Sequence, residues 1–287
     1  MRIKTNIYIL IAIFFISCSV SNDEVNDVSP DGKLFIIGGG HRSEALMDRL
    51  AKEAGVYEGG NIVILPMSSS VPDSAIIWSG ESFLELGIEP ERIKGYNFQL
   101  GEEPKKEWLE SLREAKLIYI SGGDQNRFMD VVEDSPIKDA IIEAYNKGAM
   151  VAGTSAGAAV MSEKMITGDE LRYEEYHPTF RTIETENIEL KPGLGLITTA
   201  IIDQHFVWRS RYNRILTAIL EHPELLGIGI DESTALLVEG DTAEVVGVSQ
   251  VLVFRNPERS SIVHNNIYGA RNLVLDIYLP GDKFSIR

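Results

Sequence analysis

The chain has 287 residues, of which 44% are hydrophobic and 24% charged, and its formal net charge is −16. This composition is typical of an ordinary globular protein and excludes a disordered chain. So acidic a surface repels nucleic acid and anionic lipid, although solubility alone also explains the charge, which by itself identifies no substrate.

The first residues are predicted to form an export signal. A basic start (Met1–Lys4) precedes an apolar run over 7–16, which is too short to span a membrane comfortably. Cys18, the only cysteine, follows in a context that resembles the bacterial lipobox. We expect a lipoprotein signal peptide over 1–17, lipidation at Cys18 and a tether over 18–32. The protein would then be exported and held on the periplasmic or cell-surface side by its lipid alone. A plain secretory signal with a chance cysteine, giving a secreted protein, stays open.

From Lys33 onward, short apolar runs alternate with segments of helical spacing. Strands are predicted at 34–37, 62–65, 93–98, 117–120 and 149–152, and helices at 41–54, 75–86, 107–115 and 135–147. This alternation indicates the α/β class, with a mostly parallel sheet covered by helices on both faces. Glycine clusters at 38–40, 122–123 and 153–157 follow three of the strands. Because sites on such sheets form at the carboxyl ends of strands, we expect these clusters to meet at one edge.

After residue 225 the pattern changes to short strands joined by turn residues. We predict strands at 228–230, 235–238, 243–248 and 251–254. These are typical of β-hairpins added to the sheet. A final pair, 273–279 and 284–286, is predicted around the turn Pro280-Gly281-Asp282. We expect one domain over 33–287.

The segment Gly153-Thr154-Ser155-Ala156-Gly157 fits the pattern G-x-S-x-G, with a predicted strand before it and a helical pattern after it. That context is the one required by a nucleophile elbow, in which the serine hydroxyl projects over the edge of the sheet. The following amide points at the same space and can stabilise an oxyanion. Ser155 is therefore a candidate nucleophile.

His205 is the candidate base, because it alone among the five histidines ends an apolar run, 197–202, that would return to this edge. Arg209, Arg211 and Arg214 follow it, and arginine binds carboxylates through two parallel hydrogen bonds. At about 100° per residue, one continuous helix would bring Arg209 to nearly the same face as His205 and turn the other two away. Either one of these arginines has a structural role, or the helix begins later than His205.

Four segments together resemble peptidase family S51, and in particular its cyanophycinases. These are the Ser155 motif, Ser121-Gly122-Gly123-Asp124-Gln125, the histidine segment from Asp203 to Arg214, and Gly229-Ile230-Asp231-Glu232-Ser233-Thr234-Ala235. The resemblance covers essentially the whole mature domain. It implies a flavodoxin-like fold related to class I glutamine amidotransferases.

The resemblance also implies roles for individual residues. Ser155, His205 and Glu232 would form a catalytic triad, with the amides of Gly123 and Ala156 as the oxyanion hole. The positions that match those used by the family to hold substrate are Gln125, Asp203, Gln204, Arg209, Arg211 and Arg214. The dipeptidase branch of the family takes its third residue from shortly after the serine. Asp169 and Glu170 lie there, and they stay open as alternatives to Glu232.

The implied activity is serine-type hydrolysis of cyanophycin, a polyaspartate whose side chains each carry an arginine, to β-Asp-Arg dipeptides. The arginines would bind the carboxylates of the polymer, and Asp203 with other acids would receive its guanidinium groups. The alternatives are an Asp-X or isoaspartyl dipeptidase and a lipid-anchored binding protein without catalysis. No H-E-x-x-H, cysteine cluster or P-loop is present, so neither a metal nor a cofactor is expected. We also expect a homodimer.

Overall fold

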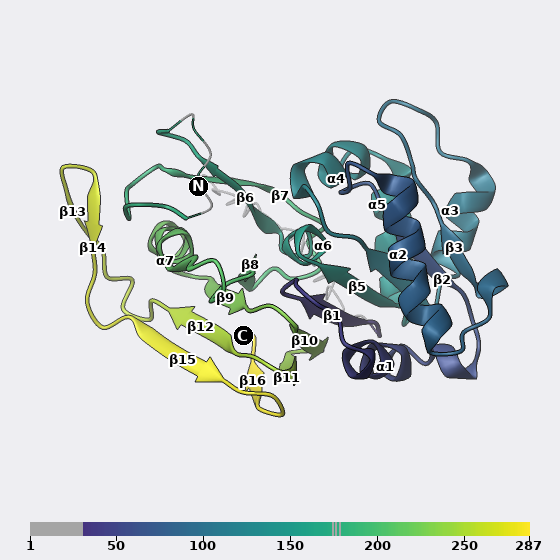
Figure 1. Ribbon diagram of the computed structural model, residues 1–287. Coiled ribbons are helices and arrows are strands. Elements are labelled where there is room, and N and C mark those ends of the chain that lie inside the picture. Colours follow the sequence, from purple (N-terminus) through teal and green to yellow (C-terminus); the bar gives the residue numbers. More distant parts are fainter. Residues whose placement is uncertain (1–30, 174, 176, 178) are drawn as a thin grey trace, which may run out of the picture.

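The computed structural model describes residues 31–287, apart from 174, 176 and 178 (Figure 1). The predicted signal peptide, Cys18 and all but the last two residues of the predicted tether therefore lie outside the described residues. Within the described part of the chain, no helix has the length and apolar character needed to cross a membrane. The main body consists of two β-sheets with helices packed against them.

The larger sheet has eight strands in the order β16-β11-β10-β1-β5-β4-β2-β3. Its parallel part consists of β1 (Lys33–Ile37), β5 (Met150–Thr154), β4 (Leu117–Ile120), β2 (Ile62–Leu65) and β3 (Ile93–Gly95). Every residue of β2, β4 and β5 is buried, which explains why these strands are continuous apolar runs in the sequence. The five predicted strands are confirmed, although β3 ends three residues earlier than predicted.

Helices cover both faces of this sheet, as predicted. Phe35 of β1 packs on the face covered by α1 and α2, whereas its neighbour Ile36 packs on the face covered by α3, α4 and α5. The helices are α1 (Glu44–Glu53), α2 (Pro72–Glu85), α3 (Lys106–Arg113), α4 (Gln125–Val132) and α5 (Pro136–Asn146). Short 3₁₀ turns at Val56–Glu58 and Pro90–Arg92 precede β2 and β3. Of the five helices, α4 was not predicted.

The second sheet has the order β15-β12-β9-β8 and lies beside the first (Figure 1). Its strands are β8 (Ala200–Gln204), β9 (Leu226–Ile230), β12 (Val251–Arg255) and β15 (Val274–Tyr278). Helix α7 (Tyr212–Glu221) connects β8 to β9, and these two strands are parallel neighbours with Gln204 opposite Ile230. Because the register is set in this way, the residues that follow β8 and β9 emerge side by side.

The C-terminal strands differ in part from the prediction. β10 (Thr234–Glu239) and β11 (Thr242–Gly247) form the expected hairpin and extend the larger sheet next to β1. The predicted final pair, however, is not a pair: β15 pairs with β12, and β16 (Lys283–Ser285) pairs with β11. The turn at 280–282 therefore carries the chain from one sheet to the other, where each strand covers the open edge of a different neighbour.

Two antiparallel ribbons complete the fold: β6 (Lys164–Glu170) with β7 (Ile188–Pro192), and β13 (Ile262–His264) with β14 (Ile267–Gly269). The segment between β6 and β7 contacts other outer parts of the fold. The Thr185 amide donates to the Asn266 carbonyl at 2.9 Å, and the Asn213 side chain of α7 donates to the Phe180 carbonyl at 2.7 Å.

Candidate active site

Ser155 lies in a sharp turn between β5 and the short helix α6 (Ala156–Ala159). Its backbone has φ 54° and ψ −109°, a conformation that a residue with a side chain keeps only when its surroundings enforce it. The turn is crowded, since a Cβ on Gly153 would lie 2.3 Å from the Gly157 carbonyl oxygen. This crowding explains why small residues flank Ser155, and the expected strand–turn–helix context is confirmed.

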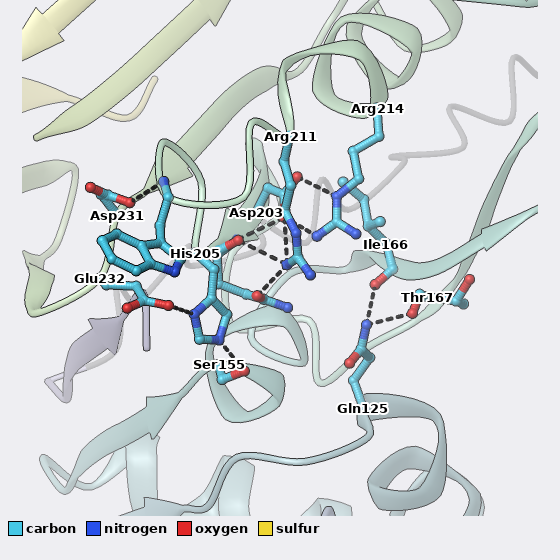
Figure 2. Close-up of polar contacts among 12 residues, drawn as sticks. Gln125, Ser155, Ile166, Thr167, Asp203, His205, Arg211, Arg214, Asp231 and Glu232 are labelled. Atoms are coloured by element: carbon cyan, nitrogen blue, oxygen red, sulfur yellow. Dashed lines mark hydrogen bonds and ion pairs between the residues drawn. The ribbon is translucent and has the colours of Figure 1, made fainter. Parts of the chain in front are cut away.

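His205 follows β8, and its imidazole lies between Ser155 and Glu232 (Figure 2). Its Nε2 is 2.8 Å from Ser155 Oγ, and its Nδ1 is 2.6 Å from Glu232 Oε1. The His205 amide donates to the Gly38 carbonyl at 2.7 Å. The ring lies directly against Gly39, where a Cβ would be 2.3 Å from ring atom Cε1. The glycine cluster after β1 thus leaves the space that the imidazole occupies.

Glu232 is the acid that the structure places beside the imidazole. It follows β9, and its side chain lies against Gly40, where a Cβ would be 2.7 Å from the Glu232 Cβ. Glu170 instead accepts a hydrogen bond from the Asn187 side chain at 2.7 Å. Asp169 is exposed on the wall of a cavity next to Ser155. Of the three acids that the sequence offers, the geometry therefore favours Glu232.

The environment of His205 favours its neutral form. Burial lowers the pKa of this imidazole below its usual value of 6.5, and the positive charges of Arg209 and Arg211 lower it further. The hydrogen bond that His205 donates to Glu232 raises the pKa but does not cancel these effects. An imidazole that is neutral near pH 7 is able to accept the proton of the serine hydroxyl.

A cavity of about 260 Å³ lies on one side of Ser155, and we call it the arginine cavity. It is lined by Gly123, Asp124, Gln125, Asn126, Ser155, Thr167, Gly168, Asp169, Gln204, Arg209, Arg211 and Arg214. All three predicted arginines therefore meet here with four further predicted site residues, Gly123, Gln125, Ser155 and Gln204. Among the predicted substrate-binding residues, Asp203 does not line this cavity.

Two of the arginines are held by protein groups (Figure 2). The Arg214 guanidinium forms a bidentate pair with Asp203, and its Nε lies 2.6 Å from Oδ2. Arg211 donates to the Gln204 backbone carbonyl at 2.8 Å and to the side-chain oxygen of the same residue. The Asp203 side chain is only 1% exposed. The contact with a substrate guanidinium that the sequence predicted for Asp203 is therefore taken by Arg214.

Arg209 is the exposed member of the three. Helix α7 begins at Tyr212, after a break at Ser210, where φ is 50°. One continuous helix from His205 is not formed, and the alternative of a helix that begins later is confirmed. A turn, in which the Arg209 amide donates to the His205 carbonyl at 2.9 Å, brings Arg209 to the cavity instead.

The predicted oxyanion donors belong to the two segments that flank Ser155. Ala156 starts α6 directly after the serine. Gly122 lies close to Ser155, since a Cβ on Gly122 would be 3.4 Å from the Ser155 Cβ. The next residue, Gly123, has φ 142°. Gln125 has a structural contact, because its side-chain amide donates to the carbonyls of Ile166 at 2.9 Å and Thr167 at 2.6 Å. These bonds tie α4 to β6 at the cavity wall.

A second cavity, of about 250 Å³, shares Ser155 and no other lining residue with the arginine cavity, and we call it the imidazole-side cavity. Its lining residues are Gly39, Gly40, Arg42, Ser69, Ala75, Trp78, Ser79, Ser121, Gly122, Thr154, Ser155 and His205. A larger cavity of about 560 Å³ is lined by residues such as Gly60, Lys116 and Ala149, which precede β2, β4 and β5. It lies at the amino ends of the strands and is remote from Ser155.

Sequence reasoning missed three residues near the site. Arg42 and Trp78 line the imidazole-side cavity. Asp231 is buried and accepts hydrogen bonds from the Trp208 amide at 2.9 Å and the Ser249 hydroxyl at 2.7 Å, which fixes the turn after His205. Its position directly before Glu232 was the available signal. In the described residues, no group of three or more His, Cys, Asp or Glu side chains is arranged to bind a metal ion.

Comparison with known proteins identifies the family of the chain. A family model described as Peptidase family S51 matches residues 34–246. The chain is 33% identical over 235 residues to the cyanophycinase of Nostoc sp., covering 78% of this chain and 75% of the relative. It is 25% identical to peptidase E of Actinobacillus pleuropneumoniae, covering 52% of this chain and 62% of the relative.

Among solved structures, a peptidase from an acI-B1 Actinobacterium superposes with a TM-score of 0.63 at 22% identity, over 88% of this chain and 96% of that one. A likeness at this identity shows the fold. The family match extends from β1 into β11 and includes every residue of the Ser155–His205–Glu232 arrangement. The chain therefore belongs to peptidase family S51 and is a serine-type peptidase.

Proposed function

We propose that the protein hydrolyses cyanophycin and releases β-Asp-Arg dipeptides. The name of the Nostoc relative supports this substrate. The observation that carries the catalytic part is the series of short contacts from Ser155 Oγ through His205 to Glu232, at 2.8 and 2.6 Å. The same arrangement of nucleophile, base and orienting acid serves acyl transfer on several unrelated folds.

In the proposed reaction, Ser155 Oγ attacks a backbone carbonyl carbon of the polymer while His205 Nε2 takes the hydroxyl proton. The C–N bond then breaks, and His205 gives that proton to the departing amine. The acyl group stays on Ser155 as an ester. Water, whose proton passes to His205, next attacks the ester carbon. The acid product leaves, and the proton returns to Ser155 Oγ.

Glu232 and two backbone amides support these steps. The Glu232 carboxylate accepts a hydrogen bond from His205 Nδ1–H. It therefore fixes the tautomer of the imidazole and stabilises the imidazolium that forms. The amides of Gly123 and Ala156 are proposed to donate to the oxyanion, since both flank the serine. Neutral His205, with its lowered pKa, starts the cycle in the state that a base needs.

Substrate recognition is proposed to use the exposed charges of the arginine cavity. Arg209 and Asp169 are both exposed and line it. Arg209 can bind a substrate carboxylate through two parallel hydrogen bonds, and Asp169 can receive a guanidinium group. Asp203 has a supporting role, because it positions Arg214 at the wall.

An Asp-X or isoaspartyl dipeptidase is the second candidate function, favoured by the similarity to peptidase E of Actinobacillus pleuropneumoniae. That branch takes its third residue from shortly after the serine. Here the corresponding acids, Asp169 and Glu170, contact other groups or line the cavity, while Glu232 contacts His205. The cyanophycinase arrangement therefore agrees better with the geometry.

Release of β-Asp-Arg from purified cyanophycin tests the proposal, with Asp-X dipeptides as the competing substrates. Ser155→Ala is expected to lower kcat by roughly 10⁴-fold or more, because only binding and the oxyanion donors remain. Glu232→Gln should lower kcat far more than Asp169→Asn, the variant that tests the alternative third residue. Near-wild-type turnover by Ser155→Ala would end the triad assignment. Cleavage of Asp-X dipeptides without cleavage of cyanophycin would establish the second candidate instead.

A further inference from the structure

The imidazole-side cavity is the side to which the leaving group departs, an inference that rests on the proposed function. His205 lines this cavity, and its Nε2 must deliver a proton to the amine as the C–N bond breaks. Gly123, the proposed oxyanion donor, lines the arginine cavity. The amine and the group attached to it therefore enter the imidazole-side cavity, which Arg209 does not line.

Arg42 gives this cavity its charge. Among the described lining residues it is the one permanently cationic side chain. Its Nε is buried and has no hydrogen-bond partner among residues 31–287 as described. No carboxylate of the described residues forms an ion pair with it. By contrast, Arg211 and Arg214 are held by Gln204 and Asp203.

An arginine left without an acid in a chain of net charge −16 requires a physical explanation. A buried guanidinium N–H without an acceptor is unfavourable, so buried arginines are normally paired with carboxylates or phosphates. The planar guanidinium binds a carboxylate through two parallel hydrogen bonds. The cavity beside the nucleophile offers room for such an acceptor on an incoming molecule.

Trp78 adds a second recognition feature to the same cavity. It belongs to α2, lines the cavity and is 57% exposed. An indole face attracts a guanidinium group through its π-electrons. Arg42 and Trp78 together match a ligand that carries both a carboxylate and a guanidinium group.

We propose that the imidazole-side cavity is a leaving-group subsite, in which Arg42 binds a free carboxylate of the departing β-Asp-Arg unit and Trp78 covers its guanidinium group. Arg42 is then a residue that determines specificity and does not take part in the bond changes. The proposal divides recognition of the substrate between two arginines, Arg209 on the acyl side and Arg42 on the leaving side.

Acyl transfer isolates the leaving-group side from the acyl side. p-Nitrophenyl acetate acetylates Ser155, and an added amine then competes with water for the acetyl group from the leaving side. The two amines to compare are β-Asp-Arg and its diamide, in which both carboxylates are neutral, at a pH where both amines are unprotonated. The wild-type enzyme should transfer acetyl to β-Asp-Arg at least about tenfold more efficiently, since one charge-assisted pair contributes this much. Arg42→Met should remove the preference. Arg113→Met, a surface variant in which only the pair with Glu143 is lost, should keep it.

The outcomes separate the two proposals. Equal transfer to both amines by the wild-type enzyme would overturn the subsite, whatever the variants do. A preference that survives in a folded Arg42→Met would overturn the role of Arg42. Acetyl transfer that persists in Ser155→Ala would overturn the triad, and the subsite with it. Acetyl transfer with the expected preference, but no cleavage of cyanophycin, would leave the subsite standing and end the substrate assignment.

Discussion

At the scale of single residues, neighbouring groups shift the pKa of His205 in opposite directions. Burial and the nearby Arg209 and Arg211 lower the pKa of His205, while Glu232 raises it. The same arginine that is proposed to bind the substrate carboxylate therefore also keeps the imidazole neutral. Binding of a carboxylate to Arg209 would offset part of its positive charge, so the base would become stronger when substrate is present.

The charge of Arg209 should be visible in the pH dependence of an uncharged ester substrate. The neutral imidazole is the active form, so kcat/KM is high above the pKa of His205 and is lost as the pH falls through it. Arg209→Met removes a positive charge that lowers this pKa, and the acidic limb should therefore move to higher pH. Arg209→Lys keeps the charge and should leave the limb in place. A limb that stays put in Arg209→Met would show that this charge does not act on the base.

How far single residues could be predicted depended on local context. Ser155 was accessible because a glycine-rich turn between a strand and a helix permits few alternatives. The geometry of Glu232 required the parallel pairing of β8 and β9, which no local pattern reveals. Arg42 left no signal beyond its place two residues after a glycine cluster. Its cavity is formed with Trp78 of α2 and with His205, which lies far along the chain.

At the scale of elements, a buried ion pair joins β8 to α7. Asp203 is the fourth residue of β8 and Arg214 the third residue of α7, and both side chains are almost fully buried. The turn that carries His205 and Arg209 lies between them. The ion pair fixes both ends of the turn that carries His205. This role explains why a buried ion pair is found here although an apolar contact would avoid the cost of desolvating two charges.

Breaking this pair should destabilise the fold. Arg214→Met leaves the Asp203 carboxylate buried without its main partner, and the free energy of unfolding should fall by about 3–5 kcal/mol. The double variant Asp203→Asn with Arg214→Met removes the stranded charge, so it should be more stable than Arg214→Met alone. Urea denaturation of the two variants and the wild type measures this. A loss below about 1 kcal/mol in Arg214→Met would mean that the pair does not fix the ends of the turn.

The elements that could be predicted well from the sequence were those whose ends are marked by glycine or proline. The strands of the parallel core are continuous apolar runs bounded by glycine or proline, and these appear in the structure with small shifts. The allocation of strands to sheets was not predictable, because β15 and β16 have patterns that suit either sheet. Helix α4 was missed because its glycine-rich start resembles a loop, although Asp124 caps it by accepting from the Asn126 amide at 2.8 Å.

At the scale of the whole molecule, the two ends of β1 have different surroundings. Its carboxyl end leads into Gly38 and the catalytic residues. Its amino end follows Asp31, which lies against Gly148 at the opposite edge of the sheet. The proposed lipid anchor at Cys18 would therefore join the domain at the edge remote from Ser155. Cys18 lies outside the residues that the structure describes, and the expected homodimer stays a prediction.

The anchor itself is open to a direct test. We expect the full chain, produced in a bacterium that lipidates exported proteins, to remain with the membrane fraction. Cys18→Ser should release it, because a serine cannot accept the thioether-linked lipid. Dipeptide release per molecule should be the same for both forms once they are solubilised. If the wild-type chain leaves the membrane fraction as completely as Cys18→Ser does, the signal is a plain secretory one.

The direction of β1 affects how an anchored molecule would meet an insoluble substrate. If Cys18 is lipidated as expected, the chain would enter the domain at the amino end of this strand, and Ser155 would lie at the edge remote from that entry. In a layer of such anchored molecules, the active sites would face an insoluble substrate particle. Each would trim the chain ends that reach it and set free pieces small enough to diffuse past its neighbours to the cell beneath.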